Sequence, residues 1–183
     1  MSAPCETTQD NRQGAGRSTG ACRVFGSLMA PADCAVILIG DLDLLPVEAG
    51  ETALTTLLEA AERHAVPALL VAPSSIAAKE TQCMRLSSDA LNPLADPDVH
   101  AALAALHRTR LVIGGGPAET ALTFTVLGAL EEGYDVHLLR DLCLGASGIP
   151  IETAVTRMIQ AGAVPVSAVQ VVAEWGCTPA PIP

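Results

Sequence analysis

The residues of this sequence that could do chemistry lie within or just after short apolar runs. Asp41 and Asp43 follow one such run, Arg85 lies within another, and a glycine-rich turn at residues 114–117 follows a third. A carboxylate can serve as a general acid or base, and a guanidinium can hold a carboxylate ionised or position an anion. These residues therefore point to acid–base chemistry on a small molecule, provided that the fold brings them together.

Metal and nucleotide chemistry have no comparable support. The six cysteines are scattered, with no CxxC pair and no Cys/His spacing of the kind that binds zinc, and the four histidines share no ligand spacing. The glycine turn lacks the Lys-Ser/Thr of a phosphate-binding loop. We therefore expect neither a metal nor a cofactor. Scattered thiols without a signal peptide favour a cytoplasmic protein.

Composition narrows the class of protein further. The chain has 183 residues and a net charge of −10, with 50% hydrophobic and 2% aromatic residues. This suits one domain with an aliphatic core and excludes a disordered chain. The acidic charge and the lack of aromatic side chains argue against nucleic-acid binding. No apolar run approaches the ~20 residues of a membrane span.

Short apolar runs alternate with segments of helical period along most of the chain. Residues 1–30 are polar and read as a flexible tail, so the predicted domain spans residues 31–178. The predicted strands are residues 34–39, 67–72, 82–86, 109–113, 134–139 and 164–166. The predicted helices are residues 47–64, 96–106, 118–132, 151–161 and 167–175.

Such alternation predicts an α/β fold: a doubly wound, six-stranded, mostly parallel sheet with helices on both faces. Ligands of these folds bind beyond the carboxyl ends of the strands, where the strand order reverses. The residues expected at that edge are Asp41, Asp43, Arg85 and the segments 114–121 and 141–147.

Several segments of the sequence together resemble one known family. Residues 111–141, LVIGGGPAETALTFTVLGALEEGYDVHLLRD, resemble the central segment of the isochorismatase-like (cysteine hydrolase) superfamily. The similarity continues in residues 151–162 and 173–175, and upstream in residues 92–98, so that it covers about residues 34–175. The resemblance implies a doubly wound sheet and, commonly, a homo-oligomer. It also implies hydrolysis of small amides, imides or ureas through an Asp–Lys–Cys triad.

The nucleophile of that triad is missing from its position. The family places the cysteine at the first turn of the helix after the glycine loop, and here that residue is Ala121. An alanine closes the covalent thioester route at this site. Cys83 and Cys143 lie nearest to the predicted edge in sequence, and we interpret both as packing thiols rather than displaced nucleophiles.

The other two triad positions leave alternatives open. Asp41 matches the catalytic carboxylate, although a register shifted by one residue would place Gly40 there, and Asp43 is a rival. Arg85 matches the cation, with Lys79 as the alternative. The catalytic residues predicted from the resemblance are therefore Asp41 and Arg85.

The turn itself is predicted to contact the substrate. In the family, a cis peptide just before this turn directs a carbonyl at the substrate. A cis bond before proline costs only about 0.5–1 kcal/mol, against about 2.5–4 kcal/mol elsewhere, so we expect Gly116–Pro117 to be cis. The residues predicted to bind substrate are Gly116, Pro117, Ala121 and Asp43.

Three functions compete on these grounds. The first is an enzyme acting on a small molecule by non-covalent acid/base chemistry through Asp41, as a hydrolase or as a lyase or rearrangement enzyme, with specialised metabolism as the expected setting. The second is an inactive family member that serves as a binding or oligomer-assembly protein. The third is a conventional amidohydrolase with a relocated thiol. The expected partners are a small-molecule substrate and further copies of the chain.

Overall fold

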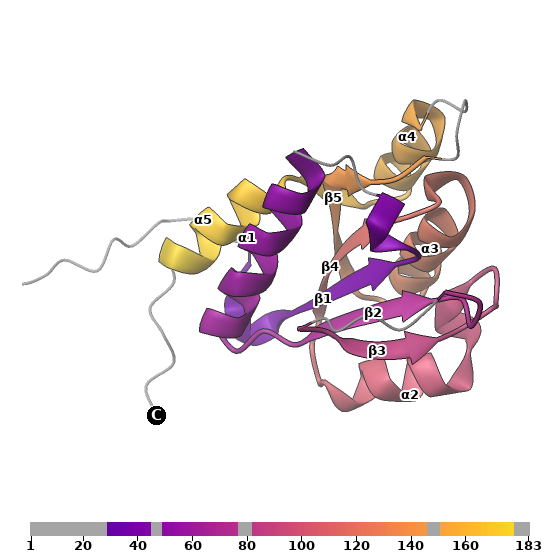
Figure 1. Ribbon diagram of the computed structural model, residues 1–183, viewed down its shortest axis with the longest axis horizontal. Coiled ribbons are helices and arrows are strands. Elements are labelled where there is room, and N and C mark those ends of the chain that lie inside the picture. The colour runs from indigo at the N-terminus through magenta and orange to yellow at the C-terminus, as the bar shows by residue number, and fades with distance from the viewer. Residues whose placement is uncertain (1–28, 45–48, 77–81, 146–150, 178–183) are drawn as a thin grey trace, which may run out of the picture.

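The computed structural model describes residues 29–44, 49–76, 82–145 and 151–177, and these form a layered α/β fold (Figure 1). The strands pair in the order β3-β2-β1-β4-β5-β6, and every pairing is parallel. Chain order reverses between β1 and β4, as the doubly wound prediction requires. The strands are β1 Cys34–Ile39, β2 Ala68–Ala72, β3 Met84–Ser87, β4 Arg110–Gly115, β5 Asp135–Cys143 and β6 Val164–Val166.

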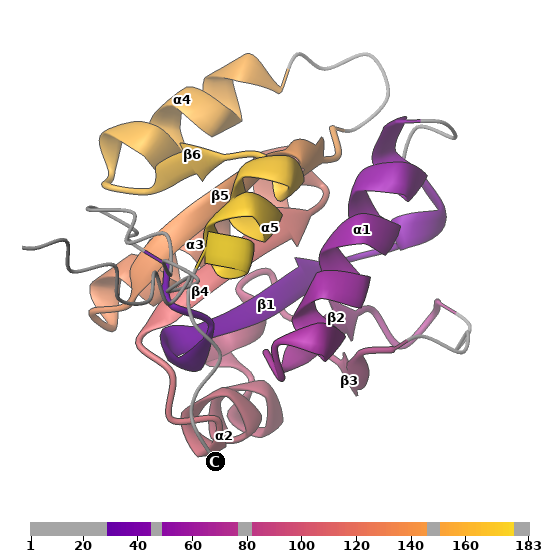
Figure 2. The ribbon, with the colours of Figure 1, turned by 90° about the vertical axis from the view of Figure 1, so that its left-hand side faces the viewer.

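Helices cover both faces of the sheet, as predicted. Side chains of α1 and α5 pack in one hydrophobic cluster, and side chains of α2, α3 and α4 pack in a second cluster on the opposite face (Figures 1 and 2). The helices are α1 Ala49–Arg63, α2 Pro97–Ala105, α3 Thr123–Glu131, α4 Glu152–Gln160 and α5 Ala168–Cys177.

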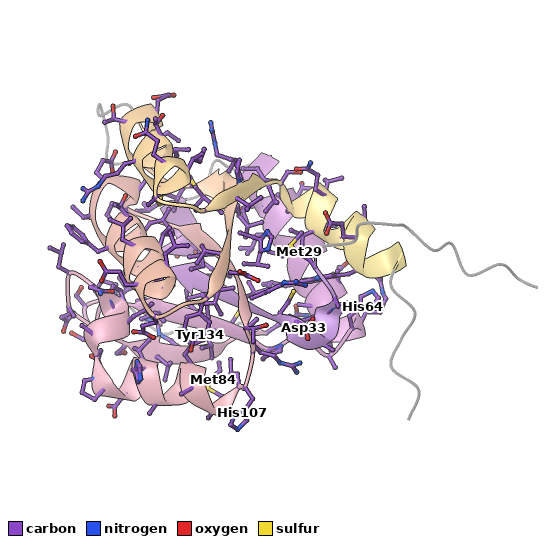
Figure 3. The ribbon with its side chains drawn as sticks, turned by 180° about the vertical axis from the view of Figure 1, so that it is seen from behind. Met29, Asp33, His64, Met84, His107 and Tyr134 are labelled. Atoms are coloured by element: carbon purple, nitrogen blue, oxygen red, sulfur yellow. The ribbon has the colours of Figure 1, made fainter. Side chains whose placement is uncertain are left out.

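The central strand β1 is buried throughout, which explains its unbroken apolar sequence. Ala35, Ile37 and Ile39 join the α2–α4 cluster, while the alternate residues join the α1/α5 cluster. The single tryptophan, Trp175, is fully buried in the α1/α5 cluster. Met29, which the sequence assigned to the tail, is also buried there, close to α5 (Figure 3). The packed chain therefore begins no later than Met29.

Helix ends follow the signals in the sequence. Asp96 Oδ1 accepts the backbone N–H two residues ahead, at the start of α2. Ser167 Oγ accepts the N–H of Gln170, and Gln170 Oε1 accepts the N–H of Ser167, which closes a reciprocal cap on α5. Gly133 and Gly162 follow α3 and α4 with φ of +87° and +120°.

Three elements differ from the prediction. Strand β3 begins two residues later and ends one residue later than expected. The expected helix over residues 118–132 opens as a wide π turn, Ala118–Leu122, before α3 begins. Strand β5 runs four residues past the predicted end, with a register shift against β4 between Ile113 and Gly115. Arg140 and Asp141 thus lie within a strand rather than in a loop. Among the described residues, no helix is long and apolar enough to cross a membrane.

Candidate active site

A pocket of about 520 Å³ opens at the carboxyl ends of the strands, where the strand order reverses. Its walls come from the ends of β1, β2 and β4 and from the segments after β3 and β5. Most of these walls are apolar, formed by Ile39, Leu44, Val71, Pro73, Ile76, Ala90, Pro93, Pro117, Ala121 and Leu144. The volume suits a small organic molecule.

Backbone hydrogen bonds join three strand ends beneath this pocket. Gly116 donates its N–H to the Ile39 carbonyl at 2.9 Å, and Ala118 donates to the Leu144 carbonyl at 2.6 Å. Gly115 has a φ of +107°, and a Cβ there would lie 2.1 Å from the Ile39 carbonyl oxygen. Gly116–Pro117 is cis, which confirms the prediction. Gly116 and Pro117 both line the pocket.

Asp41 is the carboxylate that the end of β1 contributes to the pocket. Its Oδ1 accepts the backbone N–H of Asp43 at 3.1 Å, which fixes one edge of the carboxylate. Gly40 has a φ of +84°, and a Cβ there would meet the Gly116 carbonyl oxygen at 2.1 Å. Position 40 therefore has no room for a side chain. Asp43 itself is exposed and is not among the pocket-lining residues.

Ala121 lines the pocket from the π turn, with a methyl group where the family resemblance implies a thiol. Two threonine hydroxyls stabilise this turn. Thr123 Oγ1 donates to the Ala118 carbonyl at 2.5 Å, and Thr125 Oγ1 donates to the Ala121 carbonyl at 2.7 Å. The turn thus presents Ala121 on an ordered backbone but offers no nucleophile.

The structure does not bring Arg85 into the pocket. In the parallel pairing, Arg85 lies beside Leu70, which faces the α1/α5 side of the sheet. The pocket residue Val71, one position further along, faces the opposite side. The Arg85 guanidinium donates to the Ile76 carbonyl at 2.6 Å and so holds a wall residue of the pocket, but Arg85 itself is not among the lining residues. Lys79, the alternative cation, lies outside the described residues.

Two polar pocket residues, Ser88 and Asp89, were missed by the sequence analysis. Ser88 is 6% exposed and donates its backbone N–H to the Ala72 carbonyl, which extends the β2–β3 pairing. Asp89 accepts the Ser74 hydroxyl at 2.7 Å and the Ser74 N–H at 2.9 Å. These hydrogen bonds hold the pKa of Asp89 below its ordinary value. Both residues directly follow β3, so the strand-end rule would have found them had the strand's end been placed correctly.

None of the cysteine side chains that the structure describes lines the pocket. Burial raises the pKa of Cys34 and of Cys83 to about 11, and that of Cys143 to about 12. Cys143 donates its thiol to the Leu139 carbonyl at 3.2 Å. Such buried, protonated thiols are poor nucleophiles. The same part of the chain contains no group of three His, Cys, Asp or Glu side chains that could hold a metal ion.

Asp141, which the strand-end rule also placed at the ligand edge, serves the fold instead. Its carboxylate accepts the N–H of Ala168 at 2.9 Å, at the first turn of α5. Sequence alone could not show this contact, because the two residues lie on different elements and the carboxylate could equally have faced a ligand.

A doubly wound sheet with a ligand pocket at its switch point defines a class of α/β proteins with many functions. Within that class the sequence is specific. The family model described as Isochorismatase domain matches residues 74–170, and the chain belongs to this family of isochorismatase-like hydrolases. No curated protein matches the chain.

Solved structures share the fold. The YcaC gene product of Escherichia coli, described as an octameric hydrolase of unknown specificity, is 22% identical with a TM-score of 0.73, over 82% of each chain. YcaC from Pseudomonas aeruginosa is 21% identical with a TM-score of 0.73, over 82% of this chain and 83% of that one. A cysteine hydrolase from Pseudomonas syringae is 12% identical with a TM-score of 0.67, over 81% and 94%. At these identities the likeness shows the fold alone.

Proposed function

We propose that this protein is an enzyme that acts on a small molecule by non-covalent acid–base chemistry, with Asp41 as the proton-transfer group. The observation that carries the proposal is a pocket of about 520 Å³ that includes the Asp41 carboxylate and has a methyl group at Ala121. Side chains of the described residues leave the space beside Ala121 open. An open pocket of this size is what a ligand-binding site needs.

Asp41 can work in either direction of proton transfer. As an acid it would donate a proton to the leaving atom of a hydrolysed or eliminated group, and as a base it would take a proton from water or from carbon. The hydrogen bond from Asp43 to Oδ1 orients the carboxylate for either role. The apolar walls strengthen its electrostatic effect on a bound ligand by excluding water.

The decisive experiment compares Asp41→Asn with Asp43→Asn on a panel of small amides, ureas and vinyl ethers, with products followed by mass spectrometry. Asp43→Asn is the matched control, because it removes the same charge two residues away from a side chain that does not line the pocket. We expect Asp41→Asn to lower kcat by about 10²–10⁴-fold on any turned-over substrate. Unchanged turnover would refute the role of Asp41.

A binding or assembly protein is the second candidate, and Ala121 is the observation that favours it. The same panel of compounds distinguishes the two functions, because saturable binding without turnover of any compound supports the binding protein. The third function, an amidohydrolase with a relocated thiol, has no support from the described cysteines, since none of them lines the pocket. Inactivation by iodoacetamide would revive it.

We also propose that the chain forms a homo-oligomer. The Escherichia coli neighbour is described as octameric, and this chain exposes large apolar side chains on several elements. Leu44 is 72% exposed, Leu91 59% and Val169 68%. Light scattering coupled to size-exclusion chromatography tests this proposal, and a monomeric mass at micromolar concentration would refute it.

A further inference from the structure

Ser88 places a buried hydroxyl in the wall of the pocket, where it is 6% exposed. Leu86, two residues earlier, packs against the α2–α4 cluster, and so does its β2 partner Val71, which lines the pocket. The Ser88 N–H extends this pairing to the Ala72 carbonyl at 3.0 Å. Because side chains alternate along a strand, Ser88 points to the same face as Leu86 and Val71. A polar group therefore follows apolar ones in this row.

The hydrogen of the Ser88 hydroxyl is still available for a hydrogen bond. Ser88 Oγ accepts the N–H of Ala90 at 3.3 Å, and a serine hydroxyl can donate one hydrogen bond as well. In the part of the chain that the structure describes, nothing accepts a hydrogen bond from it. By contrast, the hydroxyls of Ser74, Thr123 and Thr125 each donate to an acceptor within the fold. A buried donor without an acceptor is costly, and a ligand in the pocket can supply the acceptor.

Ser88 and Asp41 lie at opposite sides of the pocket floor. Ser88 directly follows β3 and Asp41 follows β1, and β2 lies between these two strands (Figure 1). Neighbouring strands are about 4.8 Å apart, so the ends of β1 and β3 are separated by about 10 Å. Pro73, which follows β2, lines the pocket between them. A small molecule that extends across the end of β2 therefore contacts both polar groups.

We infer that Ser88 determines the specificity of this pocket: its hydroxyl donates a hydrogen bond to a neutral acceptor of the ligand, such as a carbonyl or ether oxygen. That acceptor lies at the other end of the ligand from the atom that exchanges a proton with Asp41. The inference rests on the proposed function, since it adds a ligand class to the same pocket. A ligand without the acceptor would displace water from Ser88 and leave the hydroxyl unpaired, so the pocket selects against it.

Two probes of nearly equal size test the inference. Acetophenone has a carbonyl oxygen and ethylbenzene has none, and each is titrated into the full chain at pH 7 by ligand-observed NMR. We expect Ser88→Ala to weaken acetophenone binding by about 3–10-fold, because one hydrogen bond is lost. Ethylbenzene binding should stay within about twofold or become tighter. Comparing each probe between the two proteins removes the different costs of taking the probes out of water.

Ser87→Ala is the matched control, because it removes a hydroxyl from the exposed neighbour, which does not line the pocket, and it should change neither affinity. The infrared carbonyl stretch of bound acetophenone is a second measurement. It should lie at lower wavenumber in the wild type than in Ser88→Ala, since a hydrogen bond weakens the C=O bond. Circular dichroism and Tm confirm that each variant folds. If Ser88→Ala does not fold, Ser88→Cys takes its place, because a thiol is only a weak donor.

Three results would overturn the inference: no saturable binding of acetophenone to the wild type, an unchanged affinity for acetophenone in Ser88→Ala, or equal losses for the two probes. Its failure is distinguishable from that of the proposed function. On a turned-over substrate, Ser88→Ala should raise KM by about 3–10-fold with kcat within about twofold, whereas Asp41→Asn lowers kcat. Asp41-dependent turnover that Ser88→Ala leaves unchanged would keep the enzyme and remove the role of Ser88. Ser88-dependent binding of acetophenone without turnover of any compound would do the reverse.

Discussion

Replacing Gly40 by alanine tests the close contact that shapes the pocket floor. A Cβ at this residue would lie 2.1 Å from the Gly116 carbonyl oxygen, and φ is +84°, where an L side chain is strained. The conformational strain costs about 1–2 kcal/mol, and forcing an atom into packed backbone costs about 1–3 kcal/mol more. We therefore expect Gly40→Ala to lower the free energy of unfolding by about 2–5 kcal/mol.

Gly133→Ala separates the two contributions. Gly133 has a φ of +87°, close to that of Gly40, but a Cβ there would meet no atom within 4 Å. This control should lose only the strain, about 1–2 kcal/mol. Urea denaturation followed by the fluorescence of Trp175, the single tryptophan and fully buried, reports both values at one protein concentration. If Gly40→Ala costs no more than Gly133→Ala, the close approach of β1 to the glycine turn is refuted.

Three further predictions concern the capping carboxylate, an acid-sensitive contact and the thiols. Asp141→Ala should cost about 0.5–2 kcal/mol in urea denaturation because Ala168 loses its acceptor, whereas the exposed neighbour Arg140→Ala should change little. Because Ser74 lowers the pKa of Asp89, the wild type should be more stable than Asp89→Asn, and this difference in the free energy of unfolding should be fully present above the ordinary pKa of 3.8. It should disappear as pH falls through the lowered pKa, and an advantage that persists below it would contradict this reasoning. At pH 8, iodoacetamide should label Cys34, Cys83 and Cys143 much more slowly in the folded chain than in the unfolded chain, because each thiol has a raised pKa. Rapid labelling of any of them in the folded chain would contradict this reasoning.

The fold followed from the sequence where the determining interactions are local or periodic. Strand β1 matches its predicted bounds because a strand buried on both faces must be apolar at every position. The end of β5 was misjudged because Arg140 and Asp141 read as a loop, yet Asp141 bonds to the start of α5, far along the chain. The π turn is equally hidden, since helical spacing does not distinguish it from the first turn of an α-helix.

The site residues could be predicted from the sequence only where the ends of the strands were placed correctly. Asp41 follows a clear strand and lies in the pocket, as do Gly116, Pro117 and Ala121. Arg85 belongs to β3, a short edge strand with exposed ends and a weak pattern. Because side chains alternate between faces, a shift of one residue moves the arginine to the wrong side of the sheet.

Two features of the described walls point to the same proposed chemistry: the methyl group of Ala121 and the lack of a Lys or Arg side chain among the described lining residues. In the triad that the resemblance implies, a cation offsets the charge of both a carboxylate and a thiolate. Without a thiolate at Ala121, a buried cation beside Asp41 would hold the carboxylate ionised and leave it a poor acid. Conversely, a thiol at position 121, in the same pocket as Asp41 and with no described lining cation, would be held protonated by the negative charge of that carboxylate. The described walls are therefore consistent with proton transfer to or from Asp41 and poorly suited to covalent catalysis by a thiolate.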